Sequence, residues 1–304
     1  MCTAVSDKNL FGRTLDVEEN YGQQIVLTPR NYKKFNNKYA IFGVALIVDD
    51  YPLYFDGINE KGLAMAGLNF PGNAFYNEFS EEKTNLAPFE FLPYVLGNFE
   101  SAKEVKRELE KVNITDTYFS DSLKNTPMHW IIADKNESIT VEPLKGGLKV
   151  FDNPVGVLTN NPPFDIQLFD LNKYMKLSVK EPENTFSNQI NLKAYGRGMG
   201  ALGLPGDLSS PSRFVRAVFA KYNMIYEKGE EVTRFFHILG NVCQQKGCVI
   251  TETGEYEYTV YSNCYDRVNL KMYYKTYYGT QINSVDFAKE NFTGDKLVCY
   301  PFLN

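Results

Sequence analysis

Strand-like and helix-like segments occur in separate blocks along this chain, and their order is the feature that most limits its fold. Three segments rich in β-branched, aromatic and small apolar residues follow one another at 39–49, 53–58 and 62–70. Turn-forming residues such as Asp50 and Pro52 separate them, which is typical of successive antiparallel strands. Because these strands do not alternate with helices, the pattern predicts an α+β fold built in layers.

A first helical block follows these strands. Pro88 is well suited to the first turn of a helix, which we expect to run to about Asn98. Ser101 and Glu104 have the spacing of a capping box, which predicts a second helix ending near Val112. Both helices would lie between two groups of strands along the chain.

A second helical block lies farther along the chain. Ser210 and Pro211 are interpreted as the N-cap and first residue of a helix to about Tyr226, and 230–245 carries apolar side chains on one face. The other strand-like segments lie at 129–133, 138–142, 147–151, 155–159, 258–264, 268–277, 281–287 and 296–302. The last four are predicted to form a meander that ends at the C-terminus. This order suits two sheets between helical layers, in a single domain over residues 1–304.

Composition excludes several classes of function. A chain of 304 residues with 43% hydrophobic content can bury a large core. Its net charge of -5 and the absence of a long basic run argue against a nucleic-acid partner. The apolar run at 39–48 is too short to span a bilayer, and 1–20 lacks the pattern of a secretory signal. We therefore expect a cytoplasmic protein without membrane insertion. Five cysteines, an odd number, do not indicate a disulfide framework.

The second residue, Cys2, is the first candidate for chemistry. Removal of Met1 would leave a cysteine that carries both a thiol, with an ordinary pKa of about 8.5, and a free α-amine, with one of about 7.7–8.0. The amine could then take the thiol proton, so that nucleophile and base share one residue and no catalytic histidine is needed. By position alone, an unremarkable residue at a frayed terminus is an equally good interpretation.

Other motifs carry less weight. The glycines of 198–203 match a dinucleotide fingerprint, but Pro205 follows and blocks the helix that would receive the pyrophosphate. The cysteines lack a second properly spaced pair, so we expect no metal site. The two histidines, His129 and His237, lie among apolar residues and are interpreted as hydrogen-bonded structural residues.

Several motifs together resemble the choloylglycine hydrolase family, and in particular its bile salt hydrolases. The matching segments are Met1-Cys2-Thr3, Phe11-Gly12-Arg13-Thr14-Leu15-Asp16, Asn59-Glu60-Lys61-Gly62-Leu63, Ala66-Gly67-Leu68-Asn69-Phe70-Pro71, Leu158-Thr159-Asn160-Asn161-Pro162 and Gly203-Leu204-Pro205-Gly206-Asp207 followed by Ser212-Arg213-Phe214. The resemblance covers essentially the whole chain. It implies an N-terminal-nucleophile hydrolase fold, a four-layer αββα sandwich of two antiparallel sheets.

The resemblance also implies a reaction and an assembly. Conjugated bile salts such as taurocholate and glycocholate would lose glycine or taurine by hydrolysis of their amide bond. The reaction would use no cofactor and would pass through a thioester on Cys2. The family resemblance further implies a homotetramer.

Six residues take catalytic roles by this resemblance: Cys2, Arg13, Asp16, Asn69, Asn160 and Arg213. We expect the Asp16 carboxylate to bind the α-amine, while Arg13 and Arg213 would lower the thiol pKa and orient that carboxylate. Asn69 and Asn160 would stabilise the oxyanion. Considered alone, Arg13 and Asp16 would be interpreted as a surface ion pair, and the two asparagines as turn residues.

The steroid needs an apolar pocket. Positions that match the pocket loops of the family are Leu15, Tyr54, Phe55, Phe119 and Leu123, although each is equally compatible with ordinary core packing. Gly196-Arg197-Gly198 resembles a form associated in the family with taurine preference, and Arg197 could reach an anionic terminus.

Two alternatives remain. A penicillin V acylase would share the fold and nucleophile, but its family members commonly carry tyrosine where this chain has Asn69. A non-catalytic carrier of bile salts or lipids would suit the 22 phenylalanines and 21 tyrosines, but it would not need a nucleophile with oxyanion donors.

Overall fold

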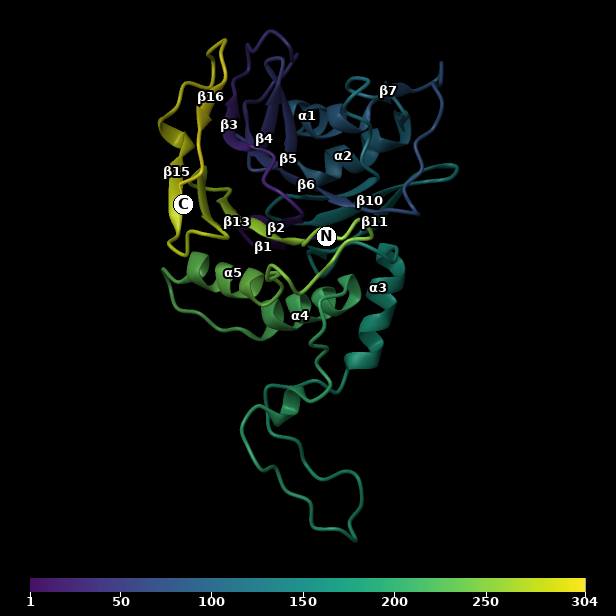
Figure 1. Cartoon of the computed structure of the whole chain (residues 1–304), viewed down its shortest axis with the longest axis vertical. Coiled ribbons are helices and arrows are strands. Elements are labelled where there is room, and N and C mark those ends of the chain that lie inside the picture. Colours follow the sequence, from purple (N-terminus) through teal and green to yellow (C-terminus); the bar gives the residue numbers. More distant parts are fainter. Residues whose placement is uncertain (304) are drawn as a thin grey trace.

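The computed structural model describes residues 1–303, in which two antiparallel sheets are stacked between helices (Figure 1). Helices α1 (Pro88–Asn98) and α2 (Ala102–Glu108) cover the outer face of one sheet. Helices α4 (Ser210–Asn223) and α5 (Glu231–Gly240) cover the outer face of the other. The predicted α+β class and four-layer αββα arrangement are confirmed.

The N-terminal strand lies inside the six-stranded sheet, whose order is β12-β1-β2-β13-β14-β15. Its strands are β12 (Val157–Leu158), β1 (Cys2–Asp7), β2 (Leu10–Val17), β13 (Tyr258–Asp266), β14 (Lys271–Thr276) and β15 (Asn283–Asp286). Each neighbouring pair is antiparallel. The first residue of β1 is therefore fixed between strands that come from distant parts of the chain.

The eight-stranded sheet has the order β11-β10-β9-β6-β5-β4-β3-β16. Its strands are β11 (Gly147–Asp152), β10 (Ser138–Leu144), β9 (Met128–Ala133), β6 (Ala64–Asn69), β5 (Tyr51–Asn59), β4 (Ile41–Val48), β3 (Gln24–Thr28) and β16 (Val298–Tyr300). Smaller elements are the parallel pair β7 (Thr84–Leu86) and β8 (Val112–Ile114), helix α3 (Phe164–Asp170) and the 3-10 turns η1 (Leu109–Lys111), η2 (Leu171–Tyr174), η3 (Met199–Ala201) and η4 (Phe287–Lys289).

The prediction that the last four strands form one meander is wrong for the fourth. The meander ends at β15, and β16 instead pairs with β3 in the other sheet. Without β16, β3 would be the unpaired edge of the eight-stranded sheet, and β16 pairs with the backbone groups of that edge. After β16 the Phe302 ring lies against two residues of the six-stranded sheet, Tyr261 at 5.2 Å and Tyr274 at 4.9 Å. The chain therefore crosses from one sheet to the other and closes one side of the sandwich.

The helix boundaries confirm the first helical block more closely than the second. The hydroxyl of Ser101 accepts a hydrogen bond from the peptide N of Glu104 at 3.3 Å, as a capping box requires. The carboxylate of Glu104, however, binds the peptide N of Glu100 instead of that of Ser101. The N-cap of α4 is Ser209. The prediction of Ser210 was wrong by one residue, because its hydroxyl is engaged elsewhere.

The second helical block is also shorter than predicted. Helix α4 ends before Met224, whose backbone is extended, and α5 ends at Gly240. The predicted extensions to 226 and 245 lie in the loops that follow.

A close approach between strands fixes the position of β2. A Cβ atom on Gly12 would lie 2.0 Å from the backbone oxygen of Asn263 in β13, so only glycine fits there. The next residue, Arg13, donates its peptide N–H to the side-chain oxygen of Asn263 at 2.9 Å. The Phe11-Gly12-Arg13 motif thus brings Arg13 against the neighbouring strand.

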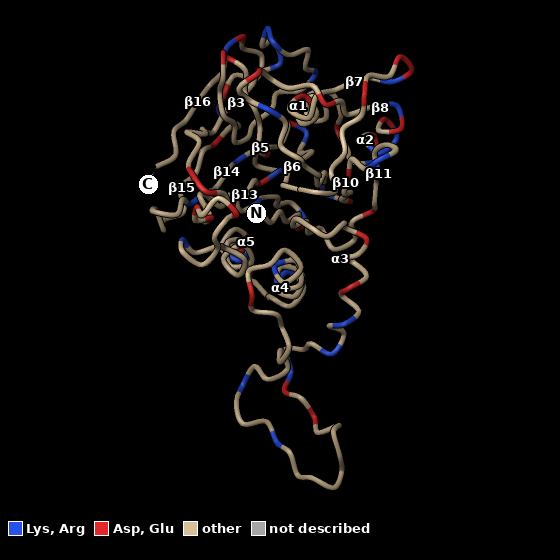
Figure 2. The backbone as a smooth tube through the Cα atoms, turned by 45° about the vertical axis from the view of Figure 1, so that its right-hand side comes forward, with Lys and Arg blue, Asp and Glu red and all other residues tan. Residues whose placement is uncertain are grey.

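One long segment, residues 175–209, projects away from the sandwich beyond α3 and α4 (Figures 1 and 2). We call it the projecting segment. It carries large apolar side chains in solvent, among them Phe186 at 82% and Tyr195 at 87% exposure. Charges of both signs are interspersed along it in Figure 2. Among residues 1–303, no helix has the length and apolar character needed to cross a membrane.

Candidate active site

The thiol-bearing residue Cys2 is buried at the start of β1. Its peptide N donates a hydrogen bond to the side-chain oxygen of Asn160 at 2.8 Å. Met1 is present, and its ammonium group donates to the backbone oxygen of Asp16 at 2.6 Å and contacts the carboxylate of Glu257. Burial lowers the pKa of this amine, although Cys2 and Asp16 act in the opposite direction. An α-amine in this place therefore gives up its proton more readily than one in water.

Asn160, which follows β12, connects several parts of the site. Its side-chain oxygen accepts from Cys2 and also from the Nη2 of Arg213 at 2.7 Å. Its Nδ2 donates to the backbone oxygen of Asn69 at 2.7 Å. The peptide N of Asn160 donates to the hydroxyl of Ser210 at 2.8 Å, which explains why Ser210 does not cap α4. The side chain of Asn160 thus contacts three other predicted catalytic residues, Cys2 and Asn69 through their backbones and Arg213 through its side chain.

A buried histidine holds the loop that carries Asn160. The Nε2 of His129 lies 2.8 Å from the backbone oxygen of Thr159, and its Nδ1 lies 3.3 Å from Glu142. Glu142 in turn accepts from the peptide N of Phe164 at 2.9 Å, on the far side of the loop. The His129 ring is also stacked on Phe70 at 4.2 Å. These contacts agree with the interpretation of His129 as a hydrogen-bonded structural residue.

Arg213 and Asp16 form the first of two buried pairs of opposite charge. The Nη1 of Arg213 donates to the backbone oxygen of Cys2 at 2.6 Å and lies 4.0 Å from the Oδ2 of Asp16. Asp16 also accepts from the hydroxyls of Thr14 at 3.0 Å and Thr259 at 2.6 Å. Burial lowers the pKa of the Arg213 guanidinium, and Asp16 acts against that effect. Arg213 lies in α4 and Asp16 lies in β2, so the pair connects this helix to the sheet that it covers.

Arg13 has a different partner. Its Nη1 donates to the backbone oxygens of Phe55 at 3.1 Å and Gly67 at 2.6 Å, and its Nε lies 4.0 Å from the Oδ2 of Asp56. The interpretation of Arg13 and Asp16 as a surface ion pair is wrong, because both are buried and each faces another residue. They are three positions apart on one strand, so their side chains point to opposite faces of the sheet.

Asp56 is a charged residue that the sequence analysis missed. It lies in β5 and is fully buried, and it accepts hydrogen bonds from three residues of β13: Tyr261, Asn263 and Tyr265. The sequence could have indicated this residue, because Asp56 is the single carboxylate inside the apolar strand predicted at 53–58. A buried charge without a partner is strongly unfavourable, so such a residue implies a partner elsewhere in the chain.

A cavity of about 320 Å³ opens beside Cys2 and has mostly apolar walls. Arg13 and Asn69 lie on its wall together with all five residues predicted to contact a steroid: Leu15, Tyr54, Phe55, Phe119 and Leu123. Further lining residues that the sequence analysis missed are Val17, Tyr21, Leu46, Leu53, Phe89 and Met128. Tyr21 is stacked against Phe55 at 6.3 Å and is 39% exposed, so it lies toward solvent. Arg197 is exposed on the projecting segment and is not part of this wall.

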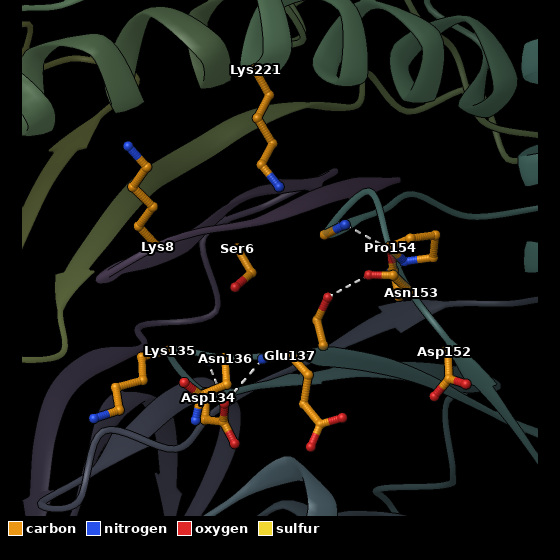
Figure 3. A pocket seen from close by; sticks show the side chains of 12 residues that line it. Ser6, Lys8, Asp134, Lys135, Asn136, Glu137, Asp152, Asn153, Pro154 and Lys221 are labelled. Carbon is orange, nitrogen blue, oxygen red and sulfur yellow. Dashed lines mark hydrogen bonds between the residues drawn. The ribbon is translucent and has the colours of Figure 1, made fainter.

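A second cavity, of about 290 Å³, lies at the other end of β1 beside Ser6 (Figure 3). Its walls are polar and carry both signs of charge, including Lys8, Asp134 and Lys221. The Nζ of Lys221 donates to the backbone oxygen of Val155 at 2.6 Å, and burial lowers its pKa to about 8. None of the predicted site residues lines this cavity. Among residues 1–303, no group of three or more His, Cys, Asp and Glu side chains is placed to hold a metal ion.

The fold and the family comparison define the class of protein. The model of the linear amide C–N hydrolases, choloylglycine hydrolase family, matches residues 1–300. The chain belongs to the choloylglycine hydrolase family and is an amide hydrolase.

Individual relatives are similar over nearly their whole length. A bile salt hydrolase/transferase of Lactiplantibacillus plantarum is 50% identical over 314 residues, which cover 99% of this chain and 97% of the relative. A bile salt hydrolase/transferase of Clostridium perfringens is 41% identical over 320 residues, with the same shares covered.

Solved structures show the same fold. The C2A mutant of the conjugated bile acid hydrolase from Clostridium perfringens superposes with a TM-score of 0.93 at 40% identity, covering 100% of this chain and 97% of that one. The penicillin V acylase from Agrobacterium tumefaciens gives a TM-score of 0.74 at 21% identity, with 98% and 90% covered. The second likeness concerns the fold alone.

Proposed function

We propose that this chain hydrolyses the amide bond of glycine- or taurine-conjugated bile salts, with Cys2 as the nucleophile. The observation that carries the proposal is the position of Cys2 on the wall of the apolar cavity, beside Arg13 and Asn69. An apolar cavity with a few polar groups at one end suits a steroid that ends in a polar amide. The names of the bile salt hydrolases to which the chain is similar support the same substrate class.

The reaction begins at the α-amine that removal of Met1 creates on Cys2. The peptide N of Cys2 donates to the side-chain oxygen of Asn160, whereas the Asp16 carboxylate binds two threonine hydroxyls. We therefore assign the orientation of the amine to Asn160, in place of Asp16. A neutral amine that gives one hydrogen to Asn160 keeps its lone pair free to take the thiol proton.

The thiolate then attacks the amide carbonyl, and negative charge develops on the carbonyl oxygen. Asn69 lies on the cavity wall beside Cys2, so its side-chain NH2 is the proposed donor to that oxyanion. The Nδ2 of Asn160 holds the backbone of Asn69 and thereby fixes the distance between donor and nucleophile. Arg13 and Arg213 supply the positive charge that stabilises the thiolate.

Collapse of the tetrahedral intermediate breaks the C–N bond and expels glycine or taurine, which receives the proton held by the α-amine. The bile acid remains bound to Cys2 as a thioester. The neutral amine then activates a water molecule, which hydrolyses the thioester and releases the free bile acid. Every step uses groups of this chain and water, and none uses a cofactor.

We also propose that the chain is one domain and assembles into a homotetramer. The exposed apolar side chains of the projecting segment support assembly, because monomers rarely expose contiguous apolar surface. Arg197 belongs to this segment, which projects away from the sandwich that contains the N-terminus (Figure 1). If Arg197 determines the preference for taurine, its side chain therefore has to reach the cavity of a second copy of the chain. The cytoplasmic location stays a prediction from the sequence.

An assay with three substrates separates the alternatives. We expect the purified chain to hydrolyse taurocholate and glycocholate faster than penicillin V, because it has Asn69 where the acylases commonly carry tyrosine. Faster cleavage of penicillin V would favour an acylase, and binding of taurocholate without turnover would favour a carrier.

The Cys2→Ala variant is the matched control for this assay. It removes the proposed nucleophile and little packing volume, so we expect a folded protein that releases no bile acid. Circular dichroism checks the fold, and chromatography of the products checks turnover. Activity near that of the parent would contradict the proposed mechanism.

A further inference from the structure

Each buried arginine near Cys2 faces one carboxylate. Arg213 lies 4.0 Å from Asp16, and Arg13 lies 4.0 Å from Asp56. Asp16 is one of the six residues to which the family resemblance gives catalytic roles, whereas Asp56 is not among them. The two pairs therefore raise the question of what the second carboxylate does for the reaction.

Asp56 is surrounded by hydrogen-bond donors. Its Oδ1 accepts from the Nδ2 of Asn263 at 2.6 Å and from the hydroxyl of Tyr265 at 2.5 Å. Its Oδ2 accepts from the hydroxyl of Tyr261 at 2.5 Å and faces Arg13. Burial raises the pKa of Asp56, while Arg13 and these three donors oppose that change. Three donors and a guanidinium around one carboxyl group select its ionised form.

A β-bulge in β5 brings Asp56 to this place. Asp56 pairs with Val44 and Tyr54 with Ala45, so Phe55 is the additional residue between them. The backbone oxygen of Phe55 accepts instead from Arg13, and its ring lies on the cavity wall. A bulge of this kind redirects neighbouring side chains. The same irregularity thus supplies a wall of the cavity, an acceptor for Arg13 and a carboxylate beside that arginine.

The charge of Arg13 acts on two negative groups at once. Burial disfavours the charged guanidinium, but Cys2, Tyr261 and Asp56 outweigh this effect and raise its pKa. Without Asp56, less of the buried positive charge of Arg13 would be balanced by a carboxylate, and that charge would favour the thiolate more strongly. Asp56 therefore limits how strongly Arg13 draws the proton from Cys2.

Other groups also face the sulfur of Cys2, and they set the background for this effect. They come from β2, the loop after it, α4, β13 and the chain start, and they are Arg13, Asp16, Tyr21, Arg213, Tyr261 and the terminal amine. Two arginines and two aspartates, Asp56 included, balance in formal charge. Loss of Asp56 leaves this enclosed site with one uncompensated positive charge.

We propose that Asp56 is the counter-ion of Arg13, a positioning residue that limits how strongly the Arg13 charge stabilises the Cys2 thiolate. The proposal rests on the proposed function only in naming Cys2 as the nucleophile. In that function the thiol proton passes to the α-amine and then to the leaving amine, which frees the α-amine to activate water. By limiting the effect of Arg13, Asp56 leaves removal of the thiol proton to the α-amine.

The test measures the pH dependence of Cys2 alkylation by iodoacetamide, followed by mass spectrometry of the N-terminal peptide. The processed enzyme is used without bile salt, so the result does not depend on the substrate. Asp56→Asn removes the charge and keeps the shape. We expect the midpoint of its alkylation profile to fall by about one pH unit, the low end of the shift that one neighbouring charge produces.

Two further variants separate charge from structure. Ile58→Val lies two residues along the same strand and removes one methyl group from a fully buried position without changing any charge, so its midpoint should stay at the parent value. Tyr265→Phe removes one donor to Asp56, which makes the carboxylate easier to protonate, and should lower the midpoint by a smaller amount. This variant serves as the test if Asp56→Asn does not fold.

The possible results are distinct. An unchanged or raised midpoint in folded Asp56→Asn overturns the proposal, as does an equal shift in Ile58→Val. If Asp56→Asn does not fold, an unchanged midpoint in Tyr265→Phe overturns it. A parent enzyme that fails to hydrolyse taurocholate while Asp56→Asn still shows the lowered midpoint would refute the proposed substrate and leave the role of Asp56 supported.

Discussion

Cations lie near both ends of β1, and the two arginines near Cys2 hold their protons more firmly than Lys221 does at the other end. At the Cys2 end, Arg13 and Arg213 each bind backbone oxygens and lie 4.0 Å from a carboxylate. At the other end, Lys221 lines the second cavity (Figure 3). It binds the backbone oxygen of Val155, and burial lowers its pKa to about 8. Arginine stays charged where it is buried, whereas the pKa of a buried lysine falls toward the working pH. Chemistry on a thiolate needs a positive charge that persists at the working pH, and Arg13 and Arg213 supply such a charge near Cys2.

The walls of the two cavities differ in the same sense. The cavity beside Cys2 is mostly apolar, so the field of a charge is weakly screened there. The cavity beside Lys221 is lined by polar side chains of both signs, which screen one another. The difference indicates that the apolar surroundings of the charges make the site suited to catalysis. The number of charges matters less.

The largest expected effect comes from blocking the amine at the Cys2 end. An uncleaved N-terminal extension converts the amine of Cys2 into an amide without useful basicity, and it occupies the place where Met1 contacts Asp16 and Glu257. We expect taurocholate hydrolysis to fall by at least about 10²-fold, the size of a general base contribution. A C-terminal tag is the control, and mass spectrometry verifies each N-terminus. Equal activity of the two tagged forms would exclude the amine as base.

A smaller effect is expected from the oxyanion donor. Asn69→Ala should lower kcat by roughly 10²–10³-fold while KM changes less, because the donor acts mainly in the transition state. Asn73→Ala is a matched control, since Asn73 binds Asn161 at 2.9 Å and does not line the cavity. Steady-state kinetics on taurocholate distinguish the two. A change confined to KM in Asn69→Ala would make that residue a substrate-binding group only.

Exchanging the two kinds of cation tests the comparison directly. Arg13→Lys should lower kcat/KM by roughly tenfold or more, because a lost hydrogen bond to a charged group is worth about 1.5–3 kcal/mol. The loss should grow with pH as the buried lysine is deprotonated. Lys221→Arg, at the other end of β1, should leave kcat/KM unchanged. Similar losses in both variants would show that the two ends do not differ in the way described.

The smallest effect concerns stability at the Lys221 end. The folded-state pKa of about 8 lies below the ordinary 10.5, so the unfolded chain binds more protons between these values and the contribution of Lys221 to stability rises with pH across that range. Lys221→Met should therefore gain stability relative to the parent below pH 8, on the order of 1 kcal/mol because the group is only partly enclosed. Urea unfolding at pH 7 and pH 10 measures this difference. If Lys221→Met gains as much stability relative to the parent at pH 10 as at pH 7, or more, this prediction would be contradicted.

Local sequence patterns predicted the layers and most of the elements. The alternation of apolar residues and turn residues marked β4, β5 and β6, and Pro88 marked the start of α1. These features depend on residues that are close in the chain, which is why they can be read without a structure. The pairing of β16 with β3 could not be predicted, because it joins two segments that lie near opposite ends of the chain.

For the candidate site, the sequence by itself determined which chemical groups are available: a cysteine at position 2, and the arginines, asparagines and aspartate of the family motifs. Tertiary structure alone decided how they are paired. Arg13 faces Asp56 from the opposite sheet instead of its near neighbour Asp16, and Asn160 instead of Asp16 binds the nitrogen of Cys2. The physical reason is that strand geometry sends Arg13 and Asp16 to opposite faces of one sheet. Each then finds the partner that the stacking of the layers brings to that face.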